Sequence, residues 1–205
     1  MTDLPTAANG APADHAADER ISWLRVPDET ELPAEVTALF ATLREKRGFV
    51  QNFFRAFALN PVHLLRATGY LFELMDPKGT RLSLRERELI AVVVSAENRC
   101  DYCLVSHGAA LRRQTGDPEL ADRVALNYRR AGLQPRERAL ADLAVRITRA
   151  SHELQAADLE PLRALGLTDE ELLEAIEVAA FFNYTNRLTS AVGVRPDARL
   201  FTAHR

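Results

Sequence analysis

The segment Cys100-Asp-Tyr-Cys103-Leu-Val-Ser-His107 places two thiols and an imidazole at spacings of three and four residues. If residues 100 to about 114 are helical, the three side chains lie within about 60° of one another, because each residue turns a helix by about 100°. Thiols three residues apart on a helix are close enough to form a disulfide. Peroxide oxidises a thiolate to a sulfenic acid, which a neighbouring thiol resolves as a disulfide. The spacing therefore predicts redox chemistry.

The position of this segment at a helix start favours a reactive thiolate. Amides at a helix N-terminus stabilise an anion and lower the pKa of a nearby thiol. His107 follows Cys103 by one turn, which places it to accept the thiol proton. Glu88, on the preceding predicted helix, needs an imidazole partner if it points inward. On spacing alone it is equally well a solvated residue, and Glu97 is a rival for the same role.

Other interpretations of the cysteine pair stay open. Buried cysteines often only pack, and the chain would then be a helical oligomerisation or regulatory module whose thiols pack or sense oxidants. A structural zinc site needs a fourth ligand, and the sequence has no second Cys-x-x-Cys or histidine pair to supply it. A thioredoxin-like site needs the motif to follow a strand, and no strand is predicted there. The joint placement of two thiols and a histidine favours redox function without a metal.

The elements around the motif predict an all-α domain of about eight helices. Ser83 and Glu86 form a capping box that begins a helix extending to about Ala96, and Thr168 and Glu171 repeat this device. Further helix boundaries are indicated at Pro33, Gly48, Asn60-Pro61, Asp76-Pro77, Asp117-Pro118, Gly132 and Gly166.

Two pairs of fragments within the chain resemble each other. Leu82–Leu89 shares its pattern with Leu133–Leu140, and Ser83–Asn98 aligns with Thr168–Asn183. An internal helical repeat explains these similarities, and shared capping chemistry explains them equally well.

The composition excludes several classes of protein. The chain has 205 residues, of which 47% are hydrophobic, and a net charge of −3, so no strong positive field attracts nucleic acid. The longest apolar run, near Leu89–Ala96, is far shorter than a membrane helix. Without a basic segment followed by an apolar one at the N-terminus, we expect a cytoplasmic protein. We predict a disordered tail over residues 1–20 and one helical domain over 21–205.

Four phenylalanines cluster after Gly48, at positions 49, 53, 54 and 57. A core or subunit-interface cluster is the preferred interpretation, and an apolar channel for an organic hydroperoxide is the alternative.

The order of the candidate residues is specific. Glu88, an eleven-residue spacer, Cys100-x-x-Cys103, three residues and His107 resemble the active-site signature of the AhpD-like alkylhydroperoxidases in the carboxymuconolactone decarboxylase superfamily. Residues 82–111 resemble the core motif of this family. The likeness extends more diffusely from Ile21 to Phe201, and Phe182-Asn-Tyr-Thr-Asn-Arg187 resembles a later segment of the peroxidase-related branch.

The resemblance implies an all-helical fold and a homo-oligomer, often a trimer or hexamer, with no metal or organic cofactor. It implies that Cys103 is the peroxidatic thiol, that Cys100 resolves it, and that His107 shuttles a proton with Glu88 as the ultimate base. The substrate would be hydrogen peroxide or an alkyl hydroperoxide. An external dithiol, such as a lipoylated protein or a peroxiredoxin cycle, would be the reductant. The alternative function is a dithiol–disulfide oxidoreductase that acts on a protein partner and has little peroxidase activity.

The chain departs from the best-studied branch at one position. Tyr102 stands where that branch has a second histidine between the cysteines, and helical geometry predicts that Tyr102 projects away from the thiols. By the same resemblance, Asn183, Asn186 and Arg187 are candidates for the cleft, although a polar helix end explains them as well. Family members without the cysteine pair process lactones, and the intact pair argues against that chemistry here.

Overall fold

The computed structural model describes residues 20–205, which fold into α-helices and short 3-10 helices without a strand in that range. The α-helices are α1 (Ala34–Arg47), α2 (Asn52–Phe57), α3 (Pro61–Leu74), α4 (Leu84–Glu97), α5 (Asp101–Thr115), α6 (Leu120–Asn127), α7 (Pro135–Ala150), α8 (Glu160–Ala164), α9 (Asp169–Ala191) and α10 (Ala198–Thr202). The 3-10 helices are Glu29–Glu31, Tyr128–Arg130, Ser151–Glu153 and Ala156–Leu159. The predicted all-α fold is confirmed. The predicted tail lies outside the described residues except for Arg20.

The described helices outnumber the eight expected because α2, α8 and α10 are only five or six residues long. Helices this short rely on tertiary contacts for their stability, so their hydrophobic pattern carries little signal. The main boundaries agree with the sequence. Gly48 ends α1 in the left-handed conformation (φ 78°), and Asn60 caps α3 by accepting a hydrogen bond from the His63 amide.

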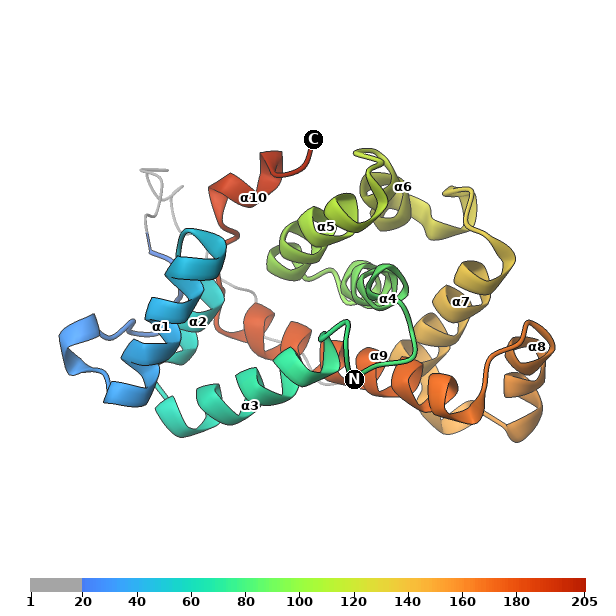
Figure 1. The fold of residues 1–205 in the computed structure, drawn as a ribbon, viewed down its shortest axis with the longest axis horizontal. Coiled ribbons are helices and arrows are strands. Elements are labelled where there is room, and N and C mark those ends of the chain that lie inside the picture. The colour runs from blue at the N-terminus through green and yellow to red at the C-terminus, as the bar shows by residue number, and fades with distance from the viewer. Residues whose placement is uncertain (1–19) are drawn as a thin grey trace, which may run out of the picture.

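The central element is α4, which contacts α5, α6, α7 and α9. In Figure 1 it is seen nearly end-on, with α5 above it, α9 below it and α7 to its right. Nine consecutive residues, Arg87–Ser95, are buried. A helix that is covered on all sides has no polar face, which explains the run of valines in this segment. Its one acidic residue in that run, Glu88, therefore needs a partner inside the fold.

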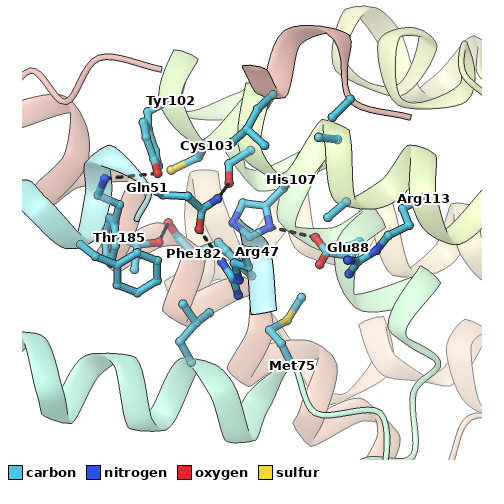
Figure 2. A pocket seen from close by; sticks show the side chains of 18 of the residues that line it. Arg47, Gln51, Met75, Glu88, Tyr102, Cys103, His107, Arg113, Phe182 and Thr185 are labelled. Atoms are coloured by element: carbon cyan, nitrogen blue, oxygen red, sulfur yellow. Dashed lines mark hydrogen bonds and ion pairs between the residues drawn. The ribbon is translucent and has the colours of Figure 1, made fainter. Parts of the chain in front are cut away.

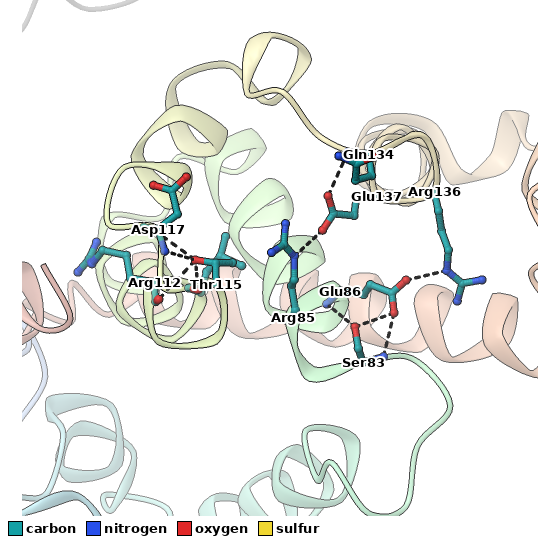
Figure 3. A network of polar contacts seen from close by, with 10 residues as sticks. Ser83, Arg85, Glu86, Arg112, Thr115, Asp117, Gln134, Arg136 and Glu137 are labelled. Carbon is teal, nitrogen blue, oxygen red and sulfur yellow. Dashed lines mark hydrogen bonds and ion pairs between the residues drawn. The ribbon is translucent and has the colours of Figure 1, made fainter.

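The starts of α4, α7 and α9 are tied together by arginines, as Figure 3 shows in part. Arg136 on α7 donates at 2.7 Å to the capping glutamate of α4, Glu86, and at 2.7 Å to that of α9, Glu171. Arg85 donates at 2.6 Å to Glu137, the capping glutamate of α7. We call these five residues the helix-start network. Each glutamate both caps its own helix and anchors a neighbouring one, so the network fixes the relative positions of three helices.

Helices α4 and α9 also meet at the C-terminal end of α4, where the side-chain amide of Asn98 donates to Oδ1 of Asn183, within α9, at 3.0 Å. These two asparagines are the ones that the internal alignment of Ser83–Asn98 with Thr168–Asn183 places in register. The two similar segments therefore lie side by side in the fold.

A second, smaller core joins α1, α2 and α3. Its buried residues are Val36, Phe40, Leu43, Val50, Phe54, Ala58 and Leu64. In Figure 1 these helices lie to one side of the α4-centred bundle, with α10 above α1 and α2. No helix in the described part of the chain is long and apolar enough to cross a bilayer.

Candidate active site

The two cysteines lie at the start of α5, but only one of them is in the helix. Cys100 is the N-cap, with an extended backbone (φ −87°, ψ 100°), and the first helical residue is Asp101. The expectation that Cys100 is itself helical is therefore wrong. The helical turn begins after it because its amide already closes the preceding turn by donating to Ser95 O at 2.9 Å. Both thiols are free, and both are buried.

The thiol of Cys103 donates a hydrogen bond to the sulfur of Cys100, and this contact sets the acidity of the pair. Together with the backbone amide of Cys103 and the hydroxyl of Ser190, and despite burial, it lowers the pKa of Cys100 to about 7. The same contact, together with burial, raises the pKa of Cys103 well above its ordinary value. Cys100 is therefore the more acidic of the two thiols, and the proton that the pair shares stays on Cys103. The amides at the start of α5 also favour a thiolate at the N-cap position.

Glu88 and His107 form an ion-pair contact between α4 and α5. His107 Nδ1 lies 2.8 Å from Glu88 Oε2, and the glutamate side chain is only 8% exposed. The rival carboxylate, Glu97, lies instead on the surface and accepts from Arg149 Nη2 at 3.0 Å. A carboxylate at Nδ1 holds the proton there and leaves Nε2 as the acceptor. The geometry therefore selects Glu88.

The ring of Phe182 from α9 packs edge-on against the imidazole of His107, with 4.4 Å between the ring centroids. Together with Glu88 this fixes the plane of the imidazole. Among the described residues, His107 and Cys103 make no direct hydrogen bond with each other. Both side chains line the same cavity instead.

This cavity has a volume of about 500 Å³ and is shown in Figure 2. Cys103, His107 and Glu88 are on its wall, whereas Cys100 lies behind Cys103 and does not line it. Cys100 has no exposed surface at all, and Cys103 retains 4%. Of the two thiols, Cys103 is therefore the one that a molecule in the cavity can reach.

Tyr102 does not point away from the thiols, contrary to the expectation from helical geometry. It is buried, lines the cavity and packs in one apolar cluster with both cysteines. Its hydroxyl accepts from the amide of Phe53 at 3.3 Å and lies 3.4 Å from Asp197 Oδ2. Burial and the nearby carboxylate raise its pKa well above the ordinary value. The reason for the difference is that α2 and the segment before α10 cover this side of α5.

Four polar residues of α9 lie under the thiols or at the cavity wall: Thr185, Asn186, Thr189 and Ser190. Asn186 was a candidate for the cleft by resemblance, and the other three were not predicted. Asn186 and Thr189 hydrogen bond with the Cys103 thiol and act to lower its pKa. Asn186 is buried and donates to Ser95 Oγ at 3.1 Å, which holds it in place. The spacing of Asn186, Thr189 and Ser190 on one helical face was the only sequence signal available.

The other two candidates for the cleft lie elsewhere. Asn183 and Arg187 do not line the cavity. Arg187 Nη1 donates to Asn183 Oδ1 at 2.7 Å, and Asn183 also donates to Thr148 at 2.9 Å. These residues are a polar link between α9 and α7, so the alternative of a polar structural role holds for them. Asn186 does not line the cavity either, but it hydrogen bonds with the Cys103 thiol.

The phenylalanine cluster is divided between the core and the wall of the cavity. Phe49, Phe53 and Phe54 line the cavity, while Phe54 also belongs to the second core. Phe57 packs against Phe53, with 4.8 Å between ring centroids, and lies behind the wall. Across residues 20–205, no three of the histidines, cysteines, aspartates and glutamates converge as metal ligands.

Comparison with known proteins gives a consistent result. The sequence matches the carboxymuconolactone decarboxylase family over residues 63–127 and again over 120–194. A search among curated proteins finds no match. The fold matches an alkylhydroperoxidase AhpD core from Ralstonia eutropha JMP134, described as an uncharacterized peroxidase-related protein, with a TM-score of 0.88 and 39% identity. That match covers 91% of this chain and 97% of the other.

Two further structures show how far the likeness extends. A peroxidase-related protein from Silicibacter sp. TM1040 has a TM-score of 0.87 and 40% identity, and the match covers 94% of this chain and 100% of that one. The debrominase Bmp8 has a TM-score of 0.72 but only 17% identity, with 91% and 97% covered, and so shares the fold alone.

Proposed function

The chain belongs to the carboxymuconolactone decarboxylase family, and we propose that it is a dithiol peroxidase that reduces hydroperoxides through a Cys100–Cys103 disulfide cycle. The peroxidase-related proteins that it resembles at 39% and 40% identity support a peroxidase-like, oxidoreductase role. One observation carries the finer proposal. A thiol that faces a cavity, Cys103, hydrogen bonds to a fully buried thiol of lowered pKa, Cys100, beside the Glu88–His107 pair.

In the first step, the sulfur of Cys103 attacks the terminal oxygen of a hydroperoxide ROOH in the cavity. The O–O bond breaks, Cys103 becomes a sulfenic acid, and RO⁻ leaves. The proton lost by Cys103 passes by way of Nε2 of His107 to RO⁻, which departs as the alcohol ROH. Glu88 stabilises the imidazolium that forms in between.

In the second step, the Cys100 thiolate attacks the sulfur of the sulfenic acid. An S–S bond forms, and hydroxide leaves as water after taking the proton of the original Cys100 thiol. In sum, two thiols and ROOH give a disulfide, ROH and H₂O. The lowered pKa of Cys100 favours this step, because the thiolate is the nucleophile.

An external dithiol reopens the disulfide and completes the cycle. We propose a lipoylated protein or a comparable dithiol as the reductant, a homo-oligomer, either trimer or hexamer, as the working form, and the cytoplasm as the location. No metal or organic cofactor takes part in the proposed chemistry.

Stopped-flow oxidation of the reduced protein by cumene hydroperoxide tests the proposal. We expect oxidation much faster than that of free cysteine, with saturation as the cavity fills. A rate no faster than that of free cysteine would instead favour a dithiol–disulfide oxidoreductase that acts on a protein partner. Slow, pH-independent alkylation of both thiols by iodoacetamide would favour a regulatory or oligomerisation module.

A further inference from the structure

The cavity is lined by far more positive than negative charge. Its permanent cations are Lys46, Arg47, Arg113 and Arg199. Its one carboxylate, Glu88, is already engaged by His107. This excess occurs in a chain whose net charge is −3, so it is local to the cavity and not a property of the whole surface. Concave sites lined by one sign of charge concentrate ligands of the opposite sign.

Arg47 projects from the end of α1 into the cavity between two aromatic rings. Its guanidinium carbon lies 5.8 Å from the centroids of both Phe54 and Phe72, and it donates a hydrogen bond to Gln51. Among the described residues, no carboxylate oxygen lies within 4.0 Å of it. A guanidinium has five N–H donors, so most of those of Arg47 are available to a ligand.

Arg113 reinforces this positive charge from α5. It follows Cys103 by ten residues, which corresponds to about 15 Å along the helix axis. It also has no carboxylate oxygen within 4.0 Å in the part of the chain that the structure describes. The pKa of Arg47 is lowered, mainly by desolvation in the cavity; the charges of Tyr102 and Glu88 act to raise it, and the charge of Arg113 acts to lower it. Two arginines thus face one cavity in which Glu88 is the single lining carboxylate, and neither of them forms an ion pair with it.

The remaining walls are apolar. They are formed by Phe49, Phe53, Phe54, Leu71, Phe72, Met75, Phe181 and Phe182. Arg199 and Lys46 complete the lining, and the guanidinium of Arg199 lies 4.6 Å from the centre of the Phe49 ring. A cavity of about 500 Å³ with apolar walls and four basic residues against one carboxylate fits an amphipathic anion.

We propose that the cavity binds organic hydroperoxides that carry a carboxylate, of the fatty-acid hydroperoxide class. Arg47 and Arg113 receive the carboxylate, the hydrocarbon lies against the phenylalanines and Met75, and the peroxide oxygen reaches Cys103. This inference rests on the proposed peroxidase function and adds its substrate class. The reaction is the one given above, with R carrying the carboxylate, so the products are a hydroxy fatty acid, water and the disulfide.

The test compares 13-hydroperoxyoctadecadienoic acid with its methyl ester, which differs only in the charge of the head group. We expect kcat/KM for the acid to exceed that for the ester at least tenfold at low ionic strength, since a charge-assisted hydrogen bond contributes about that factor. The difference falls as salt is added. Arg47→Gln and Arg113→Gln each reduce the acid-to-ester ratio, mainly through KM. Arg130→Gln, which alters an exposed arginine outside the cavity, leaves the ratio as it is.

A binding measurement separates this inference from the peroxidase proposal. We expect titration calorimetry to show that the unreactive 13-hydroxy acid binds the reduced wild-type protein and that it binds more weakly to Arg47→Gln. Equal kcat/KM values for acid and ester, unaffected by salt and by both substitutions, would overturn the substrate class alone. Failure of both hydroperoxides and of cumene hydroperoxide to oxidise the thiols would overturn the peroxidase function itself.

Discussion

Two glutamates on α4, only two residues apart, show how the same group serves different ends. Glu86 belongs to the helix-start network, where Arg136 donates to it and also to Glu171. Glu88 is more buried, with 8% of its side chain exposed against 13% for Glu86, and contacts the imidazole of His107. A guanidinium keeps its charge at every physiological pH, so the first pair only holds helices in place. An imidazole gains and loses a proton near neutrality, so the second pair can move one.

The partner of a buried carboxylate, and whether the pair faces a cavity, therefore distinguish a structural carboxylate from a catalytic one better than burial alone does. The helix-start network consists of acids and arginines that satisfy one another. The candidate active site contains groups that are only partly satisfied by the protein: a shared thiol proton, a free Nε2 and two guanidiniums without an ion-pair partner in the described part of the chain. Substitutions in the network should therefore affect stability, and substitutions in the site should affect rate.

The largest effect is expected from the thiols. Cys103→Ser should abolish oxidation by peroxide, because no sulfur then faces the cavity. Cys100→Ser should still consume one equivalent of peroxide and stop at the sulfenic acid, since the resolving thiol is gone. Rapid-mixing kinetics and trapping of the sulfenic acid with dimedone measure both. Full turnover in either variant would contradict the assignment.

The thiol pair also predicts a pH dependence. The pKa of Cys100 is lowered to about 7 chiefly by the hydrogen bond from Cys103, so Cys103→Ala should raise it towards its ordinary value. Thiolate absorbance in the ultraviolet should titrate near pH 7 in the wild type and higher in the variant. Because the folded-state pKa is below the unfolded one, the Cys100 thiolate stabilises the reduced fold above the unfolded pKa, and this contribution is lost as the pH falls through about 7. An unchanged titration in Cys103→Ala would show that the helix start alone sets the pKa.

Removal of the imidazole should have the next largest effect. His107→Gln keeps a polar side chain of similar size but removes the group that accepts a proton, so the rate of Cys103 oxidation at neutral pH should fall about 100-fold. Ser106→Ala, one residue earlier on the same helix, provides a control for disturbance of α5. Wild-type kinetics in His107→Gln would exclude His107 from the mechanism.

Substitutions in the helix-start network should lower the stability of the fold and leave the oxidation rate unchanged. Arg136→Met leaves the carboxylates of Glu86 and Glu171 without their common partner, so the free energy of unfolding should fall by about 2 kcal/mol. Arg146→Met, which breaks an exposed pair with Asp158, should cost less than about 1 kcal/mol. Urea denaturation measures both. Each variant should retain the wild-type oxidation rate per folded molecule. A lower rate in folded Arg136→Met would show that the helix-start network also contributes to catalysis, contrary to the purely structural role proposed for it.

The smallest effect on rate is expected at the carboxylate itself. Glu88→Gln still accepts a hydrogen bond from His107 but no longer stabilises its charged form, so the rate should fall on the order of tenfold. Glu97→Gln on the same helix removes a surface pair with Arg149 and serves as the matched control. An equal fall in the oxidation rate of Glu88→Gln and Glu97→Gln, or a fall in Glu97→Gln alone, would show that Glu88 does not orient the imidazole of His107.

Many features that depend on residues close together in the sequence were predicted correctly. The capping boxes at Ser83 and Thr168 gave the starts of α4 and α9 because they depend only on residues within one turn. The proximity of the thiols to each other follows from their spacing in the same way. The pairing of Glu88 with His107 could be stated only as one of two alternatives, since it depends on how α4 packs against α5.

The remaining features arise from contacts between distant segments. Thr189 and Ser190 reach the thiols from α9, more than 80 residues along the chain, and were not predicted as part of the site; Asn186 was a candidate only by resemblance. Tyr102 was expected to face away because a helical wheel assumes one outer face. Phe53 and Asp197 cover that face and make it a second interior. The positive lining of the cavity likewise comes from α1, α5 and α10 together.

Mass spectrometry of the reduced protein before and after one equivalent of hydroperoxide tests the central claim most directly. We predict the loss of two hydrogens and a single peptide in which Cys100 and Cys103 are joined. An unchanged mass, or added oxygen on the cysteines with no bond between them, would contradict it.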